Sequence, residues 1–269
     1  MSIVVPIAIV SGLGLVFGVG LSIASKVFEV KVDERIGKVR EMLPGANCGG
    51  CGYSGCDGLA EAIVMEGVSP DRCPVGGAAT AKAIAEFMGV DAGDVIAKEA
   101  RVMCNGTCEN AENKYEYFGI EDCHAANALA SGSSACSYGC LGLGSCKKVC
   151  PFDAIVIENG VAKVISERCT GCAKCVAECP KKIIHLVPTT SGFTVFCSNK
   201  DKGAQARKVC KVACIACRRC EKACNYGAIT VNDNLAVIDP EKCVNCGECA
   251  AVCPQKTISD ARVRQTVGV

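Results

Sequence analysis

CTGCAKCVAECP (residues 169–180) and CVNCGECAAVCP (residues 243–254) are the two stretches that decide the fold of this chain. Each has the spacing C-x2-C-x2-C-x3-C-P, in which three neighbouring cysteines hold one [4Fe–4S] cluster and the fourth cysteine reaches a second cluster. Two upstream runs could complete the second clusters, CSYGCLGLGSCKKVCP (residues 136–151) and CIACRRCEKAC (residues 214–224). Four such runs in tandem predict a row of iron–sulfur sites.

The cysteine runs form an internal repeat with a constant offset of 74 residues. This shift places Cys123 on Cys197 and Pro180 on Pro254. Without a gap, it also brings Cys136, Cys140, Cys146, Cys150, Cys169, Cys172, Cys175 and Cys179 onto Cys210, Cys214, Cys220, Cys224, Cys243, Cys246, Cys249 and Cys253. The duplication predicts an α+β fold with two bacterial-type ferredoxin units, each binding two clusters.

Each ferredoxin unit is expected to contain a β-hairpin and short helices. Asn159-Gly160 lies between two β-branched runs in AIVIENGVAKVI, which is a strong hairpin signal. AITVNDNLAVI repeats the pattern in the second unit, where a longer turn is expected. Small helices are expected after Cys150 and Cys179 and after the equivalent cysteines.

The composition indicates that something other than a large apolar core stabilises the chain. Its 269 residues include 25 cysteines and no tryptophan, and small domains bury too little apolar surface to be stable alone. A secreted disulfide framework is one alternative, but no cleavable signal peptide is evident and C-x2-C cysteines are poor partners for one another. Zinc is a second alternative, but a zinc site needs only two cysteine pairs. The cysteine spacing favours clusters and a reducing compartment.

The N-terminal stretch predicts a membrane anchor. Residues 1–25 contain no charged side chain, and Ile3 to Phe28 is long enough to cross a hydrocarbon core of about 30 Å as a helix. Basic residues follow it, which places the rest of the chain in the cytoplasm by the positive-inside rule. Gly14 and Gly18 form a GxxxG pattern that suits close helix packing in membranes. We therefore expect a single pass through the cytoplasmic membrane, with the cluster domains in the cytoplasm.

A separate cluster site is expected near the membrane. Cys48, Cys51, Cys56 and Cys73 have the spacing C-x2-C-x4-C-x16-C, with glycines around them. Helical apolar spacing over 57–67 and 78–88 predicts two helices that pack around this site. Residues 29–42 are charged and prone to helix, as a stalk would be. A zinc knuckle is the alternative.

The expected domains are a transmembrane anchor, a small Fe–S domain, a linker with extra cysteines, ferredoxin unit 1, ferredoxin unit 2 and a tail. Their respective boundaries are 1–28, 29–90, 91–122, 123–188, 189–260 and 261–269. A strand is expected at the end of 89–103.

Three ferredoxin sites follow from ligand exchange between the runs, and with the N-terminal site they make four. Their ligands are Cys169, Cys172, Cys175 and Cys150; Cys243, Cys246, Cys249 and Cys224; and Cys214, Cys217, Cys220 and Cys253. Nine cysteines remain, enough for two more clusters and one spare: Cys104, Cys108, Cys123, Cys136, Cys140, Cys146, Cys179, Cys197 and Cys210. We therefore expect about six [4Fe–4S] clusters, with Cys108 as the spare.

The ligands of the last two clusters are left with alternatives. Leu143 stands where the repeat requires a cysteine, so the site of Cys140, Cys146 and Cys179 lacks one ligand. If Cys104 or Cys108 fills it, the sixth cluster takes Cys123, Cys136, Cys197 and Cys210, which is the favoured, symmetric version. If Cys136 fills it, Cys123 joins Cys104 or Cys108 with Cys197 and Cys210. A third option groups Cys104, Cys108, Cys123 and Cys136 and leaves a three-cysteine site.

The charge pattern indicates a candidate docking patch. The net charge is only +1, but the segment Asn199–Lys222 holds eight basic residues against two acidic ones. This segment is either a docking patch for an acidic partner or a solvated face beside an anionic cluster. Nucleic acid is disfavoured because aromatic residues do not interleave the basic ones. The basic residues are Lys200, Lys202, Arg207, Lys208, Lys211, Arg218, Arg219 and Lys222.

The combination of an apolar helix, LPGANCGGCGYSGC (residues 43–56), CPVGG (residues 73–77) and ferredoxin runs resembles the B subunit of the Rnf electron transport complex. The resemblance covers nearly the whole chain. It implies a membrane complex that passes electrons from soluble reduced ferredoxin toward NAD and transports sodium ions or protons. It also implies companion membrane and peripheral subunits, with NAD and flavin sites on those. Simple members have one two-cluster unit, whereas this chain has two. The alternative is a polyferredoxin shuttle for a hydrogenase or heterodisulfide-type reductase.

Overall fold

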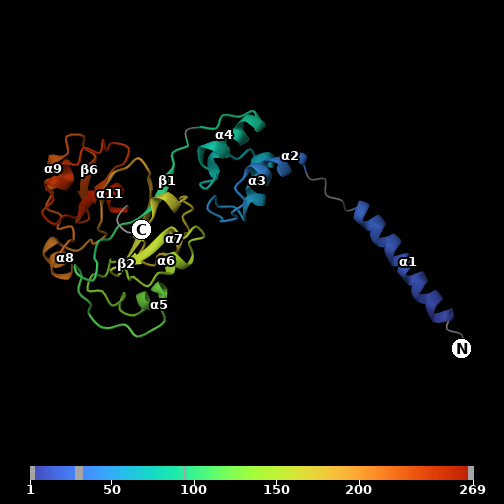
Figure 1. Ribbon diagram of the computed structural model, residues 1–269, viewed down its shortest axis with the longest axis horizontal. Helices are drawn as coiled ribbons and strands as arrows, with labels where there is room; N and C mark the ends of the chain where they lie inside the picture. The colour runs from blue at the N-terminus through green and yellow to red at the C-terminus, as the bar shows by residue number, and fades with distance from the viewer. Residues whose placement is uncertain (1–3, 28–32, 94, 266–269) are drawn as a thin grey trace.

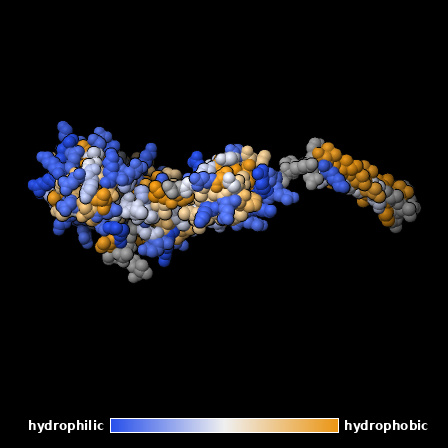
Figure 2. Space-filling view, turned by 90° about the horizontal axis from the view of Figure 1, so that it is seen from above, coloured by the Kyte–Doolittle hydropathy of each residue, from blue (hydrophilic) through white to orange (hydrophobic). Residues whose placement is uncertain are grey.

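The computed structural model describes residues 4–27, 33–93 and 95–265. Figure 1 shows an isolated N-terminal helix, a small helical domain and two mixed units, following one another along the longest axis. Helix α1 (Val4–Val27) is long and apolar enough to cross a membrane by length and composition, and its most apolar window is entirely unburied. In Figure 2 its hydrophobic surface faces outward, whereas the unit at the opposite end of the molecule is largely hydrophilic on that face.

The small domain is built from helices α2 (Glu34–Met42), α3 (Cys56–Met65) and α4 (Gly77–Met88) with the short 3-10 helix η1 (Pro70–Arg72). Both helices predicted around the N-terminal cysteines are therefore confirmed. The predicted stalk segment does form a helix, α2, but this helix is part of the small domain. It packs against α3 and α4 and buries Val39 completely. Ile36 and Val39 of α2 and its C-cap Leu43 recur at helical spacing and face this core. Residues 29–32 of that stalk lie outside the described residues.

Each mixed unit contains the predicted hairpin. Strand β2 (Ile155–Glu158) pairs with β3 (Val161–Val164), and β6 (Ile229–Asn232) pairs with β7 (Leu235–Ile238). The longer turn expected in the second hairpin is wrong, since both hairpins close with two residues. Asp233 and Asn234 adopt φ of +48° and +60°, and these residue types accept the left-handed conformation that a tight hairpin turn requires.

A second antiparallel pair completes each unit among the described residues. Strand β1 (Lys98–Val102) pairs with β4 (Ile184–Pro188), and β5 (Phe193–Val195) pairs with β8 (Ile258–Asp260). The sequence also predicts a strand near β1, but inside a linker. The structure instead places it in the first unit, so the expected unit boundary at residue 123 omits part of that unit.

The short helices lie on the opposite side of the cysteines from that expected. Helices α6 (Ser145–Lys148), α7 (Lys174–Glu178), α9 (Arg219–Ala223) and α10 (Glu248–Ala251) precede Cys150, Cys179, Cys224 and Cys253 instead of following them. Three of these cysteines are followed by proline, which favours an extended conformation in the residue before it and ends the helix there. The remaining elements are α5 (Cys123–Ala128), the 3-10 helix η2 (Ser166–Arg168), α8 (Gly203–Val209) and α11 (Ala261–Gln265).

Candidate iron–sulfur sites

The structure gathers 24 of the 25 cysteines into six sets of four, which we number in the order in which they lie. In four of these sets the cysteines line a common cavity. These are site 3 (Cys123, Cys140, Cys146 and Cys179), site 4 (Cys104, Cys136, Cys197 and Cys210), site 5 (Cys214, Cys217, Cys220 and Cys253) and site 6 (Cys224, Cys243, Cys246 and Cys249).

The two remaining sets are recognised by the effect that their cysteines have on one another's pKa values. Burial, together with the nearby charges of Cys169, Cys172 and Cys150, raises the pKa of Cys175 to about 12; these four cysteines form site 2. Burial likewise raises the pKa of Cys73, with additional contributions from Cys56 and Cys48. With Cys51, which packs on the same core, these residues form site 1.

The backbone around the ferredoxin cysteines is shaped to hold an anionic group. In each of the four C-x2-C-type loops, two residues separated by one position have a left-handed conformation, with φ between +53° and +83°. Such alternation turns successive N–H groups into one concavity, as in many anion and Fe–S sites. The loop with Leu143 in place of a cysteine has the same conformation. The left-handed pairs are Gly142 and Gly144, Gly171 and Ala173, Ala216 and Arg218, and Asn245 and Gly247.

The chemistry of the donor set fits a cluster better than the alternatives. All 25 cysteines are free thiols in the structure, which disagrees with a disulfide framework. In the part of the chain that the structure describes, no three cysteine, histidine or acidic side chains approach one point closely enough for a single metal ion. In sites 3 to 6 the four cysteines instead line a cavity, as a polynuclear cluster requires. Burial raises the pKa of Cys104 and Cys146 to about 12, so these thiols would lose their protons only when a positively charged group is bound among them.

Cys123 is the fourth cysteine of site 3, where the repeat has Leu143. Asp122 caps α5 and accepts a hydrogen bond from Ser145 Oγ at 2.8 Å, and the Cys123 N–H donates to the same Ser145 oxygen at 2.7 Å. Ser145 directly precedes Cys146, so these bonds hold Cys123 in site 3. All the expected groupings of Cys123 with Cys197 and Cys210, and the one with Cys104, Cys108 and Cys136, are therefore wrong.

Cys104 takes the place beside Cys197 that the repeat predicts for Cys123. Cys104 Sγ accepts hydrogen bonds from the N–H groups of Gly106 and Cys140, both at 3.4 Å. Cys197 Sγ accepts the equivalent bonds from Asn199 and Cys214, also at 3.4 Å. Site 4 therefore has the expected symmetric form, two cysteines from each unit, but with Cys104 as its fourth member.

An insertion in the first unit explains why the 74-residue repeat wrongly paired Cys123 with Cys197. β1 and β5 occupy equivalent places, and their equivalent residues Val102 and Val195 are separated by 93 residues, not 74. The first unit thus carries 19 additional residues between Cys104 and Cys136, and Cys123 lies in this insertion. The coincidence of Cys123 with Cys197 at the 74-residue shift is accidental. A signal for the correct pairing is present in the sequence, since Val102-Met103-Cys104 resembles Val195-Phe196-Cys197.

Cys108 is in none of the six sets. It is exposed, its N–H donates to the Asn159 carbonyl at 2.9 Å, and its sulfur faces Gly160 in the β2–β3 turn.

The six sites form one continuous row. Site 1 adjoins site 2, because a Cβ on Gly50 would lie 2.7 Å from the Cys172 carbonyl oxygen and the charge of Cys48 contributes to the raised pKa of Cys172, after burial. Sites 2 and 3 share a core through Cys175 and Cys146. Backbone N–H groups of sites 3 and 5 bind the sulfurs of site 4 from either side, and sites 5 and 6 share a core again.

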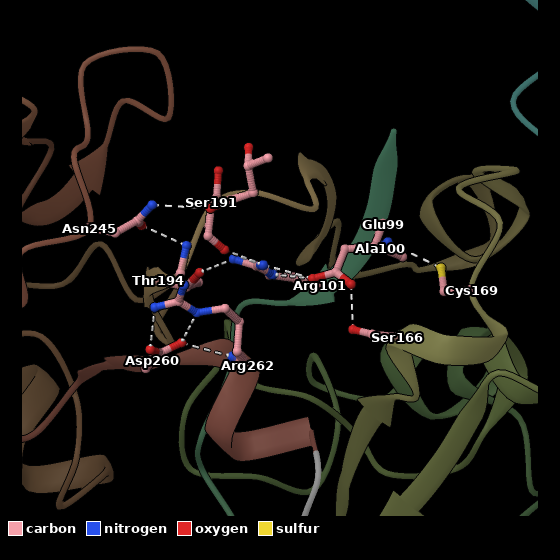
Figure 3. Close-up of polar contacts among 12 residues, drawn as sticks. Glu99, Ala100, Arg101, Ser166, Cys169, Ser191, Thr194, Asn245, Asp260 and Arg262 are labelled. Carbon is pink, nitrogen blue, oxygen red and sulfur yellow. Dashed lines mark hydrogen bonds and ion pairs between the residues drawn. The ribbon is translucent and has the colours of Figure 1, made fainter. Parts of the chain in front are cut away.

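A buried ion pair joins the two units between these sites (Figure 3). Arg101 and Glu99 are 2.7 Å apart, with side chains 1% and 4% exposed. Arg101 donates to Thr194 Oγ1 at 2.8 Å and to the Ser191 carbonyl, while Glu99 accepts from Ser166. The adjacent Ala100 N–H donates to Cys169 Sγ at 3.3 Å. The pair therefore fixes β1 simultaneously against site 2 and against the second unit.

The basic segment lies on the surface of the second unit. All eight of its lysines and arginines are exposed. Arg218 pairs with Glu221 at 3.2 Å, and Lys200 approaches Asp233 at 3.8 Å. Among the cysteines of the six sites, Cys217 of site 5 and Cys246 of site 6 are the exposed ones. The solvent-facing end of the row is thus in the second unit.

Comparison with known proteins agrees with these sites. Residues 43–75 match a family described as "Putative Fe-S cluster", and residues 129–180 and 213–257 each match a "4Fe-4S dicluster domain". The chain is 55% identical over 259 residues to the B subunit of the Na(+)-translocating ferredoxin:NAD(+) oxidoreductase complex of Acetobacterium woodii, covering 96% of this chain and 78% of that one.

Two further relatives are similar over almost their entire length. The B subunit of the ion-translocating oxidoreductase complex of Methanosarcina acetivorans is 43% identical, with 94% of this chain and 96% of that one covered. The B subunit of the proton-translocating ferredoxin:NAD(+) oxidoreductase complex of Clostridium ljungdahlii is 41% identical, with coverage of 96% and 92%.

Fold and sites together define an iron–sulfur electron-transfer protein of the dicluster ferredoxin type, with a helix that fits a membrane. The identities and coverage are sufficient to name the family: the chain belongs to the family of B subunits of ion-translocating oxidoreductase complexes.

Proposed function

We propose that this chain is the subunit that accepts electrons from reduced ferredoxin in a membrane-bound, ion-translocating ferredoxin:NAD oxidoreductase. The observation that carries the proposal is the unbroken row of four-cysteine sites between the α1 end of the chain and the exposed end of the second unit. The names of the Acetobacterium and Clostridium relatives, which describe complexes with this activity, support it. NAD would react on a companion subunit.

Six [4Fe–4S] clusters would be held, one in each site, by every cysteine except Cys108. A bound cluster supplies a group that takes up and releases an electron without bond-making chemistry. The chain positions the sulfur atoms, donates N–H bonds to several of them and leaves only Cys217 and Cys246 of the site cysteines exposed to water. The four left-handed loops and the buried thiols described above support this assignment.

Ferredoxin would dock on the second unit. Its basic surface suits an acidic protein, and Cys217 and Cys246 are exposed in the same unit. Electrostatic steering of this kind favours fast, salt-dependent association. At the other end, α1 would cross the membrane with Lys26 at its cytoplasmic end.

Purification of an affinity-tagged full-length chain from solubilised membranes tests the proposal. Companion subunits should be recovered with it, and the preparation should reduce NAD with reduced ferredoxin as the electron donor. A variant with Cys217→Ser should lose most of this activity, whereas Cys108→Ser should keep it. Recovery of the chain alone, or electron transfer only to a hydrogenase or heterodisulfide-type reductase, would identify a polyferredoxin shuttle instead.

A further inference from the structure

Site 4 is the junction through which the two units are connected. Cys104 and Cys136 come from the first unit and Cys197 and Cys210 from the second. All four are buried or half-buried, so an additional negative charge here is poorly solvated by water. Hydrogen bonds to sulfur stabilise such a charge and raise the reduction potential of an iron–sulfur group.

Backbone donors serve the site with near symmetry. Cys104 and Cys197 each accept two N–H bonds at equivalent positions. One side-chain donor breaks this symmetry. Asn199 is 1% exposed, and its Nδ2 donates to Cys136 Sγ at 3.4 Å. The position equivalent to Asn199 in the first unit is Gly106, which has no side chain to offer.

We infer that Asn199 is a tuning residue that raises the reduction potential of the site 4 cluster through its N–H bond to Cys136. The inference rests on the proposed function, because it requires a cluster in site 4. Without this donor, the enclosed junction between the units is harder to reduce, and electrons pass less readily from the second unit to the first.

The side chain has a second contact that the test must preserve. Asn199 Oδ1 accepts the Asp201 N–H at 2.7 Å and so also shapes the local turn. Asn199→Ser keeps an oxygen that can accept this bond, and it is too short to reach Cys136. Asn199→Asp keeps the length and the accepting oxygen but has no amide donor. Asn234→Ser is the matched control, since Asn234 is exposed in the same unit and its amide binds the Lys200 carbonyl.

Redox titration of the full-length holoprotein, followed by EPR, measures the effect. The signal that disappears in Cys104→Ser identifies the site 4 cluster. The midpoint potential of this signal should shift to a more negative value in Asn199→Ser and Asn199→Asp, with unchanged iron content and unchanged neighbouring signals. Asn234→Ser should leave every midpoint in place.

The outcomes separate the two levels of inference. If Cys104→Ser removes no signal, the ligand assignment of the proposed function fails. If Cys104→Ser removes one signal, but neither Asn199 variant moves it, the tuning role is overturned. If the Asn199 variants lose about four irons per chain, the count for one [4Fe–4S] cluster, Asn199 has a structural role and the tuning role is again overturned.

Discussion

Cys104 and Cys108 are four residues apart, yet the structure gives them opposite surroundings. Cys104 is buried between two N–H donors in site 4, whereas Cys108 is exposed at a hairpin turn. We expect Cys104→Ser to lower the iron content from about twenty-four to about twenty atoms per chain, because one four-iron cluster loses a ligand. Cys108→Ser should keep all the iron. Equal iron content in both variants, measured with acid-labile sulfide, would contradict the assignment.

The buried ion pair of Arg101 and Glu99 leads to a second prediction, which concerns stability. Arg101→Met leaves Glu99 buried without its partner, so it should cost about 3–5 kcal/mol of stability. The double variant with Glu99→Leu should recover much of this loss, because no unpaired charge remains. Arg262→Met is the control: Arg262 and Asp260 form a pair whose arginine is 54% exposed, and loss of such a pair costs less than about 1 kcal/mol. Anaerobic thermal unfolding compares the stability of these variants. Equal losses of stability in Arg101→Met and Arg262→Met would contradict the prediction.

At the scale of elements, the loop that carries site 1 meets the loop that carries site 2 through a glycine. A Cβ on Gly50 would stand 2.7 Å from the Cys172 carbonyl oxygen, far inside van der Waals contact. Gly50→Ala should therefore push the two loops apart and weaken the magnetic interaction between the reduced clusters of sites 1 and 2, seen by EPR. Gly37→Ala, in α2 with open space around it, should change nothing. An unaltered interaction in Gly50→Ala would mean that the contact is not required.

Differences in length between equivalent segments of the two units explain the errors in the cysteine assignment. The 74-residue repeat correctly aligned the hairpins and the C-x2-C loops, because these are local and share one length in both units. Cys104 and Cys123 belong to segments before the first run, where the units differ by an insertion. The fourth cysteine of site 3 comes from α5 within that insertion, which no spacing rule places beside Cys146.

At the scale of the whole molecule, the basic surface and the exposed cysteines lie at one end of the row. Arg207→Glu reverses a charge on α8 without changing a cysteine neighbour. It should slow electron uptake from reduced ferredoxin several-fold at low ionic strength. The difference should vanish at high salt, because dissolved ions screen exposed charges that are more than about 10 Å apart at 0.1 M and closer ones at higher salt. Lys82→Glu on α4 makes the same kind of change in the N-terminal domain and should have no effect. Stopped-flow kinetics measures the rate of electron uptake in both variants. Equal rates in Arg207→Glu and Lys82→Glu would exclude this docking surface.

The other end of the molecule carries the membrane prediction. With α1 inserted and the cluster domains in the cytoplasm, protease added to right-side-out vesicles should leave the domains intact. The same protease should digest them after the vesicles are opened with detergent. Cleavage in sealed vesicles would reverse the proposed orientation.

The sequence by itself determined the class of this protein, since cysteine spacing is a local property that specifies which ligands share a loop. From it follow the α+β ferredoxin units, the N-terminal four-cysteine domain, the apolar helix and both hairpins. Only the tertiary structure decided which cysteines meet across large distances in sequence. Site 4 joins Cys104 to Cys210, and site 3 takes Cys123 from an insertion, because strand pairing and the Asp122–Ser145 bonds bring these segments together. The order of the six sites and the buried Asn199 donor likewise depend on packing between units, which no local pattern encodes.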